Sequence, residues 1–151
     1  MKYLLDSDAV NVLYDDGRKK HHKAIHRKIS LLRDEDMLQI SVLVLYELEY
    51  SFFNAPADKK ICIRNTIDSL LRDFDAVLPV EQVAAPVFGE LKALLRKKKN
   101  LSRKEMRKHN IDIMLASTAI INSSVLVGAD SIYGDIENLN PMFRSEDWFD
   151  V

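Results

Sequence analysis

The sequence contains few of the residues that cross-link a chain, stiffen it or anchor it in a membrane. Its 151 residues include one cysteine, four prolines and four glycines. A single cysteine excludes an intrachain disulfide, and Cys62 lies in a helical pattern, where we expect a small core residue. No apolar run approaches the roughly 20 residues of a membrane span. We therefore expect no membrane partner and a cytoplasmic location.

The chain also lacks a large net charge, since it has 22 basic and 23 acidic residues. The distribution is uneven, because 14 of the 22 basic residues lie in the segments 17–28 and 96–108. An acidic site beside basic segments is the layout expected for metal-assisted chemistry on a polyanion. Two solvated helix faces would give the same pattern.

Short apolar segments alternate with longer helical patterns along the whole chain. The expected strands are 3–5, 37–41, 76–80, 124–130 and one within 141–149. The expected helices are 9–14, 24–32, 42–53, 57–74, 81–99 and 110–122. This alternation predicts an α/β protein, with a three-layer α/β/α fold and a central, mostly parallel sheet of four or five strands. The length predicts a single domain over residues 1–151.

Four acidic residues follow predicted strands or open predicted helices. Asp6 follows the first strand and Asp130 ends a late one, so parallel strands would bring both to the same edge of the sheet. Glu47 lies early in the helix after the second strand. Asp112 lies in the first turn of its helix, with Asn110 as the expected N-cap.

Carboxylates that converge without histidine or cysteine form a hard oxygen site, which suits Mg²⁺ or Mn²⁺. Taken singly, Glu47 is an exposed helical charge and Asp112 complements a helix dipole. Only the set of four predicts a metal site. We expect Asp8 to support or cap this site rather than to act in catalysis.

Four ordered motifs carry these acids. They are "YLLDSDAVNVL", "QISVLVLYELEYS", "NIDIMLASTAII" and "LVGAD", followed by "NPMFRSEDW" near the end. In this order they resemble the PIN-domain ribonucleases, specifically the VapC-like toxins of type II toxin–antitoxin systems. The fourth motif departs from the family, because Gly128 stands where threonine is usual and removes a hydroxyl that often supports the site. Asp135 is an alternative to Asp130 as the fourth acid.

The resemblance implies a PIN-like fold and metal-dependent endonucleolytic cleavage of RNA. Asp6, Glu47 and Asp112 would coordinate the ion, and Asp130 would help directly or through water. The basic segment 96–108 would hold the RNA backbone. A homodimer and a small antitoxin that occludes the site are also implied. Aromatic residues within 45–53 could line a partner groove, although we expect core packing for most of them.

Two other functions are compatible with parts of the sequence. "YLLDSDAV" also resembles the motif of haloacid-dehalogenase-type phosphatases, with Asp6 as nucleophile and Asp8 as general acid/base. That mechanism leaves Glu47 and Asp112 without a role. Because Gly128 replaces the expected threonine, a catalytically silent RNA- or protein-binding module on the same scaffold is the third hypothesis.

The histidines do not predict a metal site. His22 and His26 have the i,i+4 spacing of zinc ligands, but no third ligand lies near them in the sequence. We expect all four histidines to be solvated or to face phosphate: His21, His22, His26 and His109.

Overall fold

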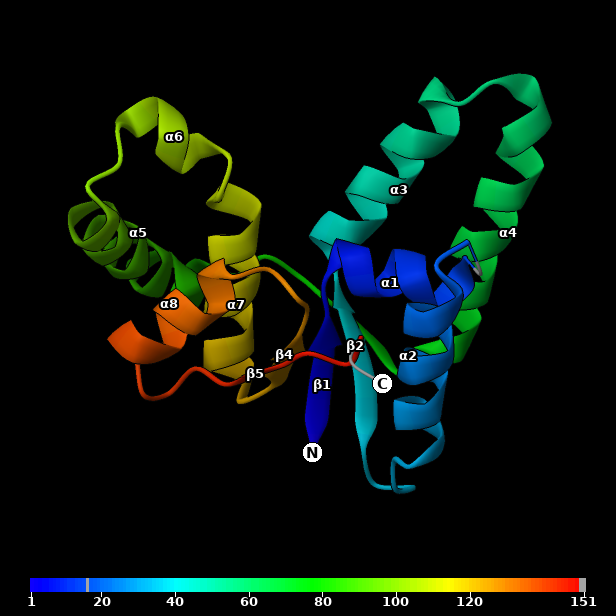
Figure 1. The fold of residues 1–151 in the computed structure, drawn as a ribbon, viewed down its shortest axis with the longest axis horizontal. Helices are drawn as coiled ribbons and strands as arrows, with labels where there is room; N and C mark the ends of the chain where they lie inside the picture. The colour runs from blue at the N-terminus through cyan, green and yellow to red at the C-terminus, as the bar shows by residue number, and fades with distance from the viewer. Residues whose placement is uncertain (16, 150–151) are drawn as a thin grey trace.

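Five strands form one sheet that is covered by helices on both faces (Figure 1). The computed structural model describes residues 1–15 and 17–149. The strands are β1 (Lys2–Leu5), β2 (Met37–Ser41), β3 (Ala76–Leu78), β4 (Val125–Val127) and β5 (Ser145–Glu146). The helices are α1 (Ser7–Tyr14), α2 (Lys19–Ser30), α3 (Val42–Asn54), α4 (Ala57–Asp73), the 3-10 turn η1 (Gln82–Ala84), α5 (Ala85–Lys99), α6 (Arg103–Arg107), α7 (Asn110–Asn122) and α8 (Ile132–Leu139).

The sheet has the strand order β3-β2-β1-β4-β5, and every neighbouring pair is parallel. The chain runs outward from β1 through β2 to β3, and then returns to place β4 on the other side of β1. The order therefore reverses between β1 and β4. In open α/β sheets, ligands bind outside the carboxyl ends of the strands at such a point.

Two hydrophobic clusters fill the spaces on the two faces of the sheet. Leu5 packs in the cluster beneath α1–α4, whereas its neighbour Leu4 packs in the cluster beneath α5–α8. Val127 and Leu126 divide in the same way. Successive side chains of a strand point to opposite faces, so a strand buried on both faces is apolar throughout. The predicted three-layer α/β/α fold is confirmed.

Two short helices were not predicted. The basic segment 96–108 contains α6, whose N-cap Ser102 accepts a hydrogen bond from the backbone N–H of Glu105 at 3.1 Å. The spacing of this serine and glutamate is a helix-start signal, but the many charges around it obscure any apolar stripe. The helix α8 buries Ile132, Tyr133 and Ile136, and it lies in a segment for which the sequence predicted no element.

The prediction for Cys62 was wrong, because this side chain is exposed on α4. The buried side chains of α4 are Ile67 and Leu70, with Ile63 partly buried beside them. Residues at this spacing share one face of a helix, and Cys62 lies outside it.

The prediction that most aromatic side chains of α3 pack in the core was also wrong. Tyr46, Tyr50 and Phe53 are about 70% exposed, at 70%, 69% and 73%. The core face of α3 is formed by Val44 and Leu48, which are one turn apart.

No helix of the described residues is long and apolar enough to cross a membrane.

Candidate active site

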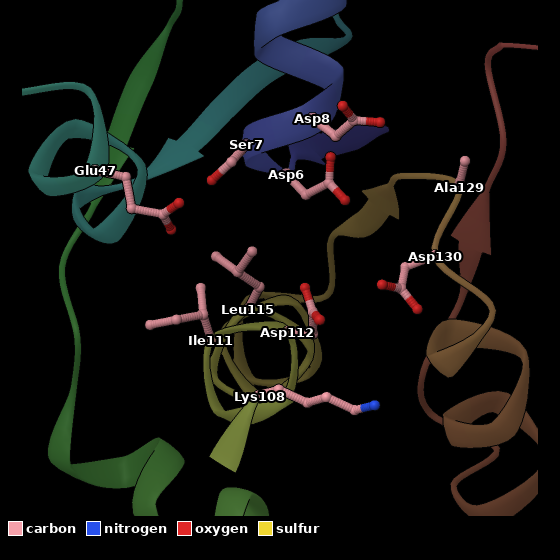
Figure 2. A pocket seen from close by; sticks show the side chains of 10 residues that line it. All are labelled: Asp6, Ser7, Asp8, Glu47, Lys108, Ile111, Asp112, Leu115, Ala129 and Asp130. Carbon is pink, nitrogen blue, oxygen red and sulfur yellow. The ribbon is translucent and has the colours of Figure 1, made fainter. Parts of the chain in front are cut away.

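All four predicted acids line one pocket of about 520 Å³ at the carboxyl ends of β1 and β4. Figure 2 shows Asp6 and Asp112 facing each other across the pocket, with Glu47 and Asp130 on opposite sides of them. The acids come from the end of β1, from α3, from α7 and from the loop after β4. The prediction that these strands and helices deliver their acids to one edge of the sheet agrees with this placement.

Asp6 is the most deeply buried of these acids, at 6% exposure. It is the N-cap of α1, and its Oδ1 accepts a hydrogen bond from the backbone N–H of Ala9 at 2.8 Å. Burial raises the pKa of Asp6 from 3.8 to about 6, although hydrogen bonds from Ala9 and Tyr133 favour the ionised form. A buried carboxylate without a neighbouring cation is costly, so this position carries an energetic penalty in the metal-free protein.

Asp112 is half-buried in the first turn of α7. Its Oδ1 accepts a hydrogen bond from the Tyr133 hydroxyl at 3.2 Å. Burial raises the pKa of Asp112, and the negative charge of Asp130 raises it further. Asn110 is not the N-cap, contrary to the sequence prediction, because α7 already begins at Asn110 after His109.

Glu47 and Asp130 complete the pocket from its more exposed sides. Asp130 follows β4, and its Oδ1 accepts a hydrogen bond from the backbone N–H of Ile132 at 2.9 Å. The alternative fourth acid, Asp135, does not line the pocket and instead forms an ion pair with Lys99 at 2.6 Å. The structure thus brings Asp130, and not Asp135, to the other three acids.

Three further polar residues received no individual role from the sequence, two of them in the pocket and one beside it. Ser7 lines the pocket, and its buried Oγ has no hydrogen-bond partner within the described residues. Lys108 is the only cation that lines the pocket among the described residues, and it was hidden within a long basic run. Tyr133 donates its hydroxyl to Asp6 and Asp112, and no motif of the sequence marked it.

The donors of the pocket fit a hydrated divalent cation better than a fully enclosed one. Within residues 1–15 and 17–149, no three His, Cys, Asp or Glu side chains are grouped tightly enough to hold a metal ion by themselves. Mg²⁺ usually keeps several waters and binds through one or two carboxylates. Asp6 and Asp112, which share the Tyr133 hydroxyl, form such a pair. The unpartnered Ser7 Oγ is a further polar group free to contact a bound ion or its water.

Three of the histidines contact backbone carbonyl oxygens, which the sequence did not predict, although His26 is exposed as expected and His21 and His22 are half-buried. His22 Nδ1 lies 2.8 Å from the carbonyl oxygen of Val12, and His26 Nε2 lies 3.0 Å from that of Leu13. His21 Nδ1 lies 3.0 Å from the carbonyl oxygen of Phe149. These side chains attach α2 to the end of α1 and to the C-terminal segment.

Similar folds occur in solved structures of toxin–antitoxin complexes. A chain of VapBC2 from Rickettsia felis, bound to a DNA fragment from its promoter, is 23% identical with a TM-score of 0.74, and the match covers 98% of this chain and 99% of that one. A chain of FitAcB from Neisseria gonorrhoeae is 15% identical with a TM-score of 0.76, and the match covers 99% of each chain. A chain of VapBC-5 from Mycobacterium tuberculosis, of the VapBC family of toxin-antitoxin systems, is 17% identical with a TM-score of 0.67, and the match covers 97% of this chain and 98% of that one.

At these identities the similarity establishes the fold. No protein-family model and no curated protein matches the sequence. The resemblance to VapC-like PIN domains, first indicated by four short motifs, is therefore confirmed for the PIN-like fold over nearly the whole chain.

Proposed function

We propose that this chain is a divalent-metal-dependent endoribonuclease that acts as a VapC-like toxin. The observation that carries the proposal is the convergence of Asp6, Glu47, Asp112 and Asp130 on one pocket at the point where the strand order reverses. Asp8 lines the same pocket, and five acids beside a single lysine would repel a phosphodiester unless a cation neutralised them. The neighbouring folds, which belong to toxin–antitoxin complexes, support the same function.

Asp6 and Asp112 would hold the Mg²⁺ or Mn²⁺ ion, with Glu47 and Asp130 contributing directly or through water. When bound, such an ion lowers the pKa of a coordinated water and offsets negative charge on the phosphate. Lys108 lines the same pocket and would attract the phosphate oxygens. Leu115 and Ile111 supply an apolar wall on the side of α7.

A second hollow, of about 370 Å³, lies between α5 and α6 and would hold the RNA strand beyond the site of cleavage. Four cations line it, from α5 and α6: Lys92, Arg96, Arg103 and Arg107. Within the described residues no acid lines this hollow, and none of the four cations forms an ion pair. Arg107 lines the basic hollow and the next residue, Lys108, lines the acidic pocket, so one peptide unit separates them.

RNA binding is tested on Asp6→Asn protein, which should not cleave, by the fluorescence anisotropy of a labelled single-stranded RNA. Arg103→Gln together with Arg107→Gln should weaken binding and lower its dependence on salt, by roughly 0.7 in logarithmic slope for each phosphate that the variant no longer neutralises. The matched control is Lys23→Gln with Arg27→Gln on α2, which removes two exposed charges of the other basic segment. Equal reductions in affinity from both pairs would indicate binding by general charge rather than by this hollow.

Cleavage is tested with end-labelled RNA in Mn²⁺ or Mg²⁺, and in EDTA. Asp6→Asn, Glu47→Gln and Asp112→Asn should each abolish cleavage. Asp135→Asn is the matched control, because this acid pairs with Lys99 outside the pocket. Wild-type rates in all three site variants would contradict the proposal. If the protein binds RNA equally well in EDTA and in Mn²⁺ and does not cleave it in Mn²⁺, the result would instead support the catalytically silent module.

An antitoxin and a second copy of the chain are the proposed protein partners. The resemblance implies both, and the similar folds come from complexes with antitoxins. The exposed aromatic side chains of α3, Tyr46, Tyr50 and Phe53, supply an apolar surface that suits a protein contact. Light scattering of the purified chain, alone and with the product of the adjacent gene, would measure both associations.

A further inference from the structure

Tyr133 joins two of the proposed metal ligands through one oxygen atom. Its hydroxyl lies 3.0 Å from Oδ2 of Asp6 and 3.2 Å from Oδ1 of Asp112. A phenol has one proton, so it donates to one carboxylate at a time while remaining close to both. The ring is 1% exposed and lies beside Phe143, with ring centroids 6.2 Å apart. The hydroxyl is therefore held in place by a packed ring.

The hydrogen bond to Asp6 fixes the direction of that carboxylate. Oδ1 of Asp6 accepts from the backbone N–H of Ala9, and Oδ2 accepts from Tyr133. With both oxygens engaged, the plane of the carboxylate is defined, while each oxygen keeps a free lone pair for a cation. For Asp112, Tyr133 provides the only hydrogen bond to the carboxylate among the described residues.

Gly128 provides the space that this arrangement needs. A Cβ atom at position 128 would lie 2.2 Å from Oδ2 of Asp6 and 2.6 Å from Cε2 of Tyr133. Any side chain at this position would therefore displace the carboxylate, the ring or both. The resemblance places threonine here, with a hydroxyl that supports the site. In this chain the hydroxyl arrives instead from α8, five residues later.

We propose that Tyr133 is a positioning residue that holds Asp6 and Asp112 for the divalent cation, in place of the threonine that Gly128 replaces. Gly128 and Tyr133 then act together: the glycine leaves the space, and the tyrosine supplies from the first turn of α8 the hydroxyl that a threonine would supply from the loop after β4. Partners that orient metal ligands typically change metal affinity by 10- to 100-fold when they are removed. This inference rests on the proposed function, because it assumes a cation at the acidic pocket.

The test is Tyr133→Phe, which removes one oxygen and keeps the buried ring. Mn²⁺ binding is measured from the electron paramagnetic resonance signal of free Mn²⁺, without RNA, and unfolding is followed thermally in EDTA. The matched control is Tyr14→Phe. The Tyr14 hydroxyl donates a hydrogen bond of 3.1 Å to Asp73, and neither of these residues lines the acidic pocket. Tyr133→Phe should raise the Mn²⁺ dissociation constant by about 10- to 100-fold, and Tyr14→Phe should leave it unchanged.

The two readouts separate positioning from simple stabilisation. We expect the Tm in EDTA to change no more for Tyr133→Phe than for Tyr14→Phe. An unchanged Mn²⁺ dissociation constant in Tyr133→Phe, with wild-type binding intact, would overturn the role of Tyr133 and leave the proposed function standing. Absence of Mn²⁺ binding in the wild-type protein would contradict both. If both tyrosine variants lost Mn²⁺ affinity and both had the same fall in Tm, the effect of Tyr133→Phe would be structural, and the positioning role would be contradicted.

Discussion

Asp8 forms an ion pair with Arg18, whose guanidinium nitrogen lies 2.7 Å from the Asp8 carboxylate. Asp6, two residues earlier, is buried and caps α1. The two acids that stand together in the sequence therefore have different surroundings. The capping role considered for Asp8 belongs to Asp6 instead, whereas Asp8 lines the pocket beside it, so a supporting role for Asp8 stays a prediction. Both acids line the pocket, but a mechanism that uses Asp8 as general acid needs its carboxyl group to face the substrate, whereas the ion pair engages it with Arg18 at the N-terminus of α2.

Asp8→Asn should retain RNA cleavage within a few-fold of the wild-type rate. The ion pair with Arg18 is about half exposed, and such pairs contribute about 1 kcal/mol or less to stability. A phosphatase that uses Asp8 as general acid would lose its activity in the same variant. The rates of RNA cleavage and of hydrolysis of a phosphate monoester, measured on both proteins, distinguish the two.

Asp6→Asn should stabilise the metal-free protein at pH 7 while it removes metal binding. The pKa of Asp6 is raised from 3.8 to about 6 by burial, so the ionised carboxylate destabilises the native state. Asparagine caps a helix as well as aspartate does, and it carries no charge. We expect a gain of about 1–3 kcal/mol in the free energy of unfolding, measured by urea denaturation in EDTA. A loss of stability in this variant would mean that the buried charge is compensated in the folded protein.

The same pKa predicts the sign of a pH dependence. Between about pH 4 and 6 the native state keeps the proton of Asp6 and the unfolded state has lost it, so stability falls as the pH rises through this window. Above about pH 6 both states are ionised and the penalty is constant. Urea denaturation of the wild-type and Asp6→Asn proteins at pH 4, 5, 6 and 7 should show a difference that grows to pH 6 and then stays level.

Metal affinity should have the opposite dependence on pH. A carboxylate must be deprotonated to bind a cation, and the pKa of Asp6 in the metal-free protein is about 6. The association constant for Mn²⁺ should therefore fall about tenfold per pH unit below pH 6. Isothermal titration calorimetry at pH 5 and 7 measures this, and equal affinities would exclude Asp6 as a ligand that must lose its proton.

Gly128→Ala should destabilise the protein and disrupt the site. The added Cβ would lie 2.2 Å from an oxygen of Asp6, and overpacking of this kind costs about 1–3 kcal/mol. The matched control is Gly134→Ala in α8, where a Cβ would meet nothing within 4 Å. This control should be neutral or slightly stabilising, because alanine favours a helix over glycine. Equal thermal stabilities of the two variants would show that the chain adjusts around position 128 without cost.

Much of the fold followed from local patterns, and the exceptions have a common physical cause. The strands 37–41 and 3–5 were expected within one residue of their observed bounds, because both are short, apolar and followed by helix-start signals. The strand 124–130 was expected to be longer than Val125–Val127. It ends early because the loop that carries Gly128 and Asp130 turns toward the pocket. Periodicity marks a buried face, but it does not mark where the chain leaves the sheet.

The side-chain predictions that failed were those that depended on a partner far along the chain. Cys62 and the aromatic residues of α3 lie in helices with many apolar residues, yet only one face of each helix is buried. The histidines of α2 lie in a basic run, yet carbonyl groups of α1 and of the C-terminal segment contact them. Composition near a residue does not specify which neighbours tertiary packing brings to it.

By itself the sequence determined the order of the strands and of the helices other than α6 and α8, and it placed Asp6, Glu47, Asp112 and Asp130 at positions that parallel strands and the helices between them bring to one edge. Those inferences rest on periodicity and on chain direction, which act over a few residues. Only the tertiary structure decided that Asp130 rather than Asp135 lines the pocket, and that Tyr133 contacts Asp6 across 127 positions of sequence. That contact depends on how α8 packs against the sheet and on the space left by Gly128, which no local pattern encodes.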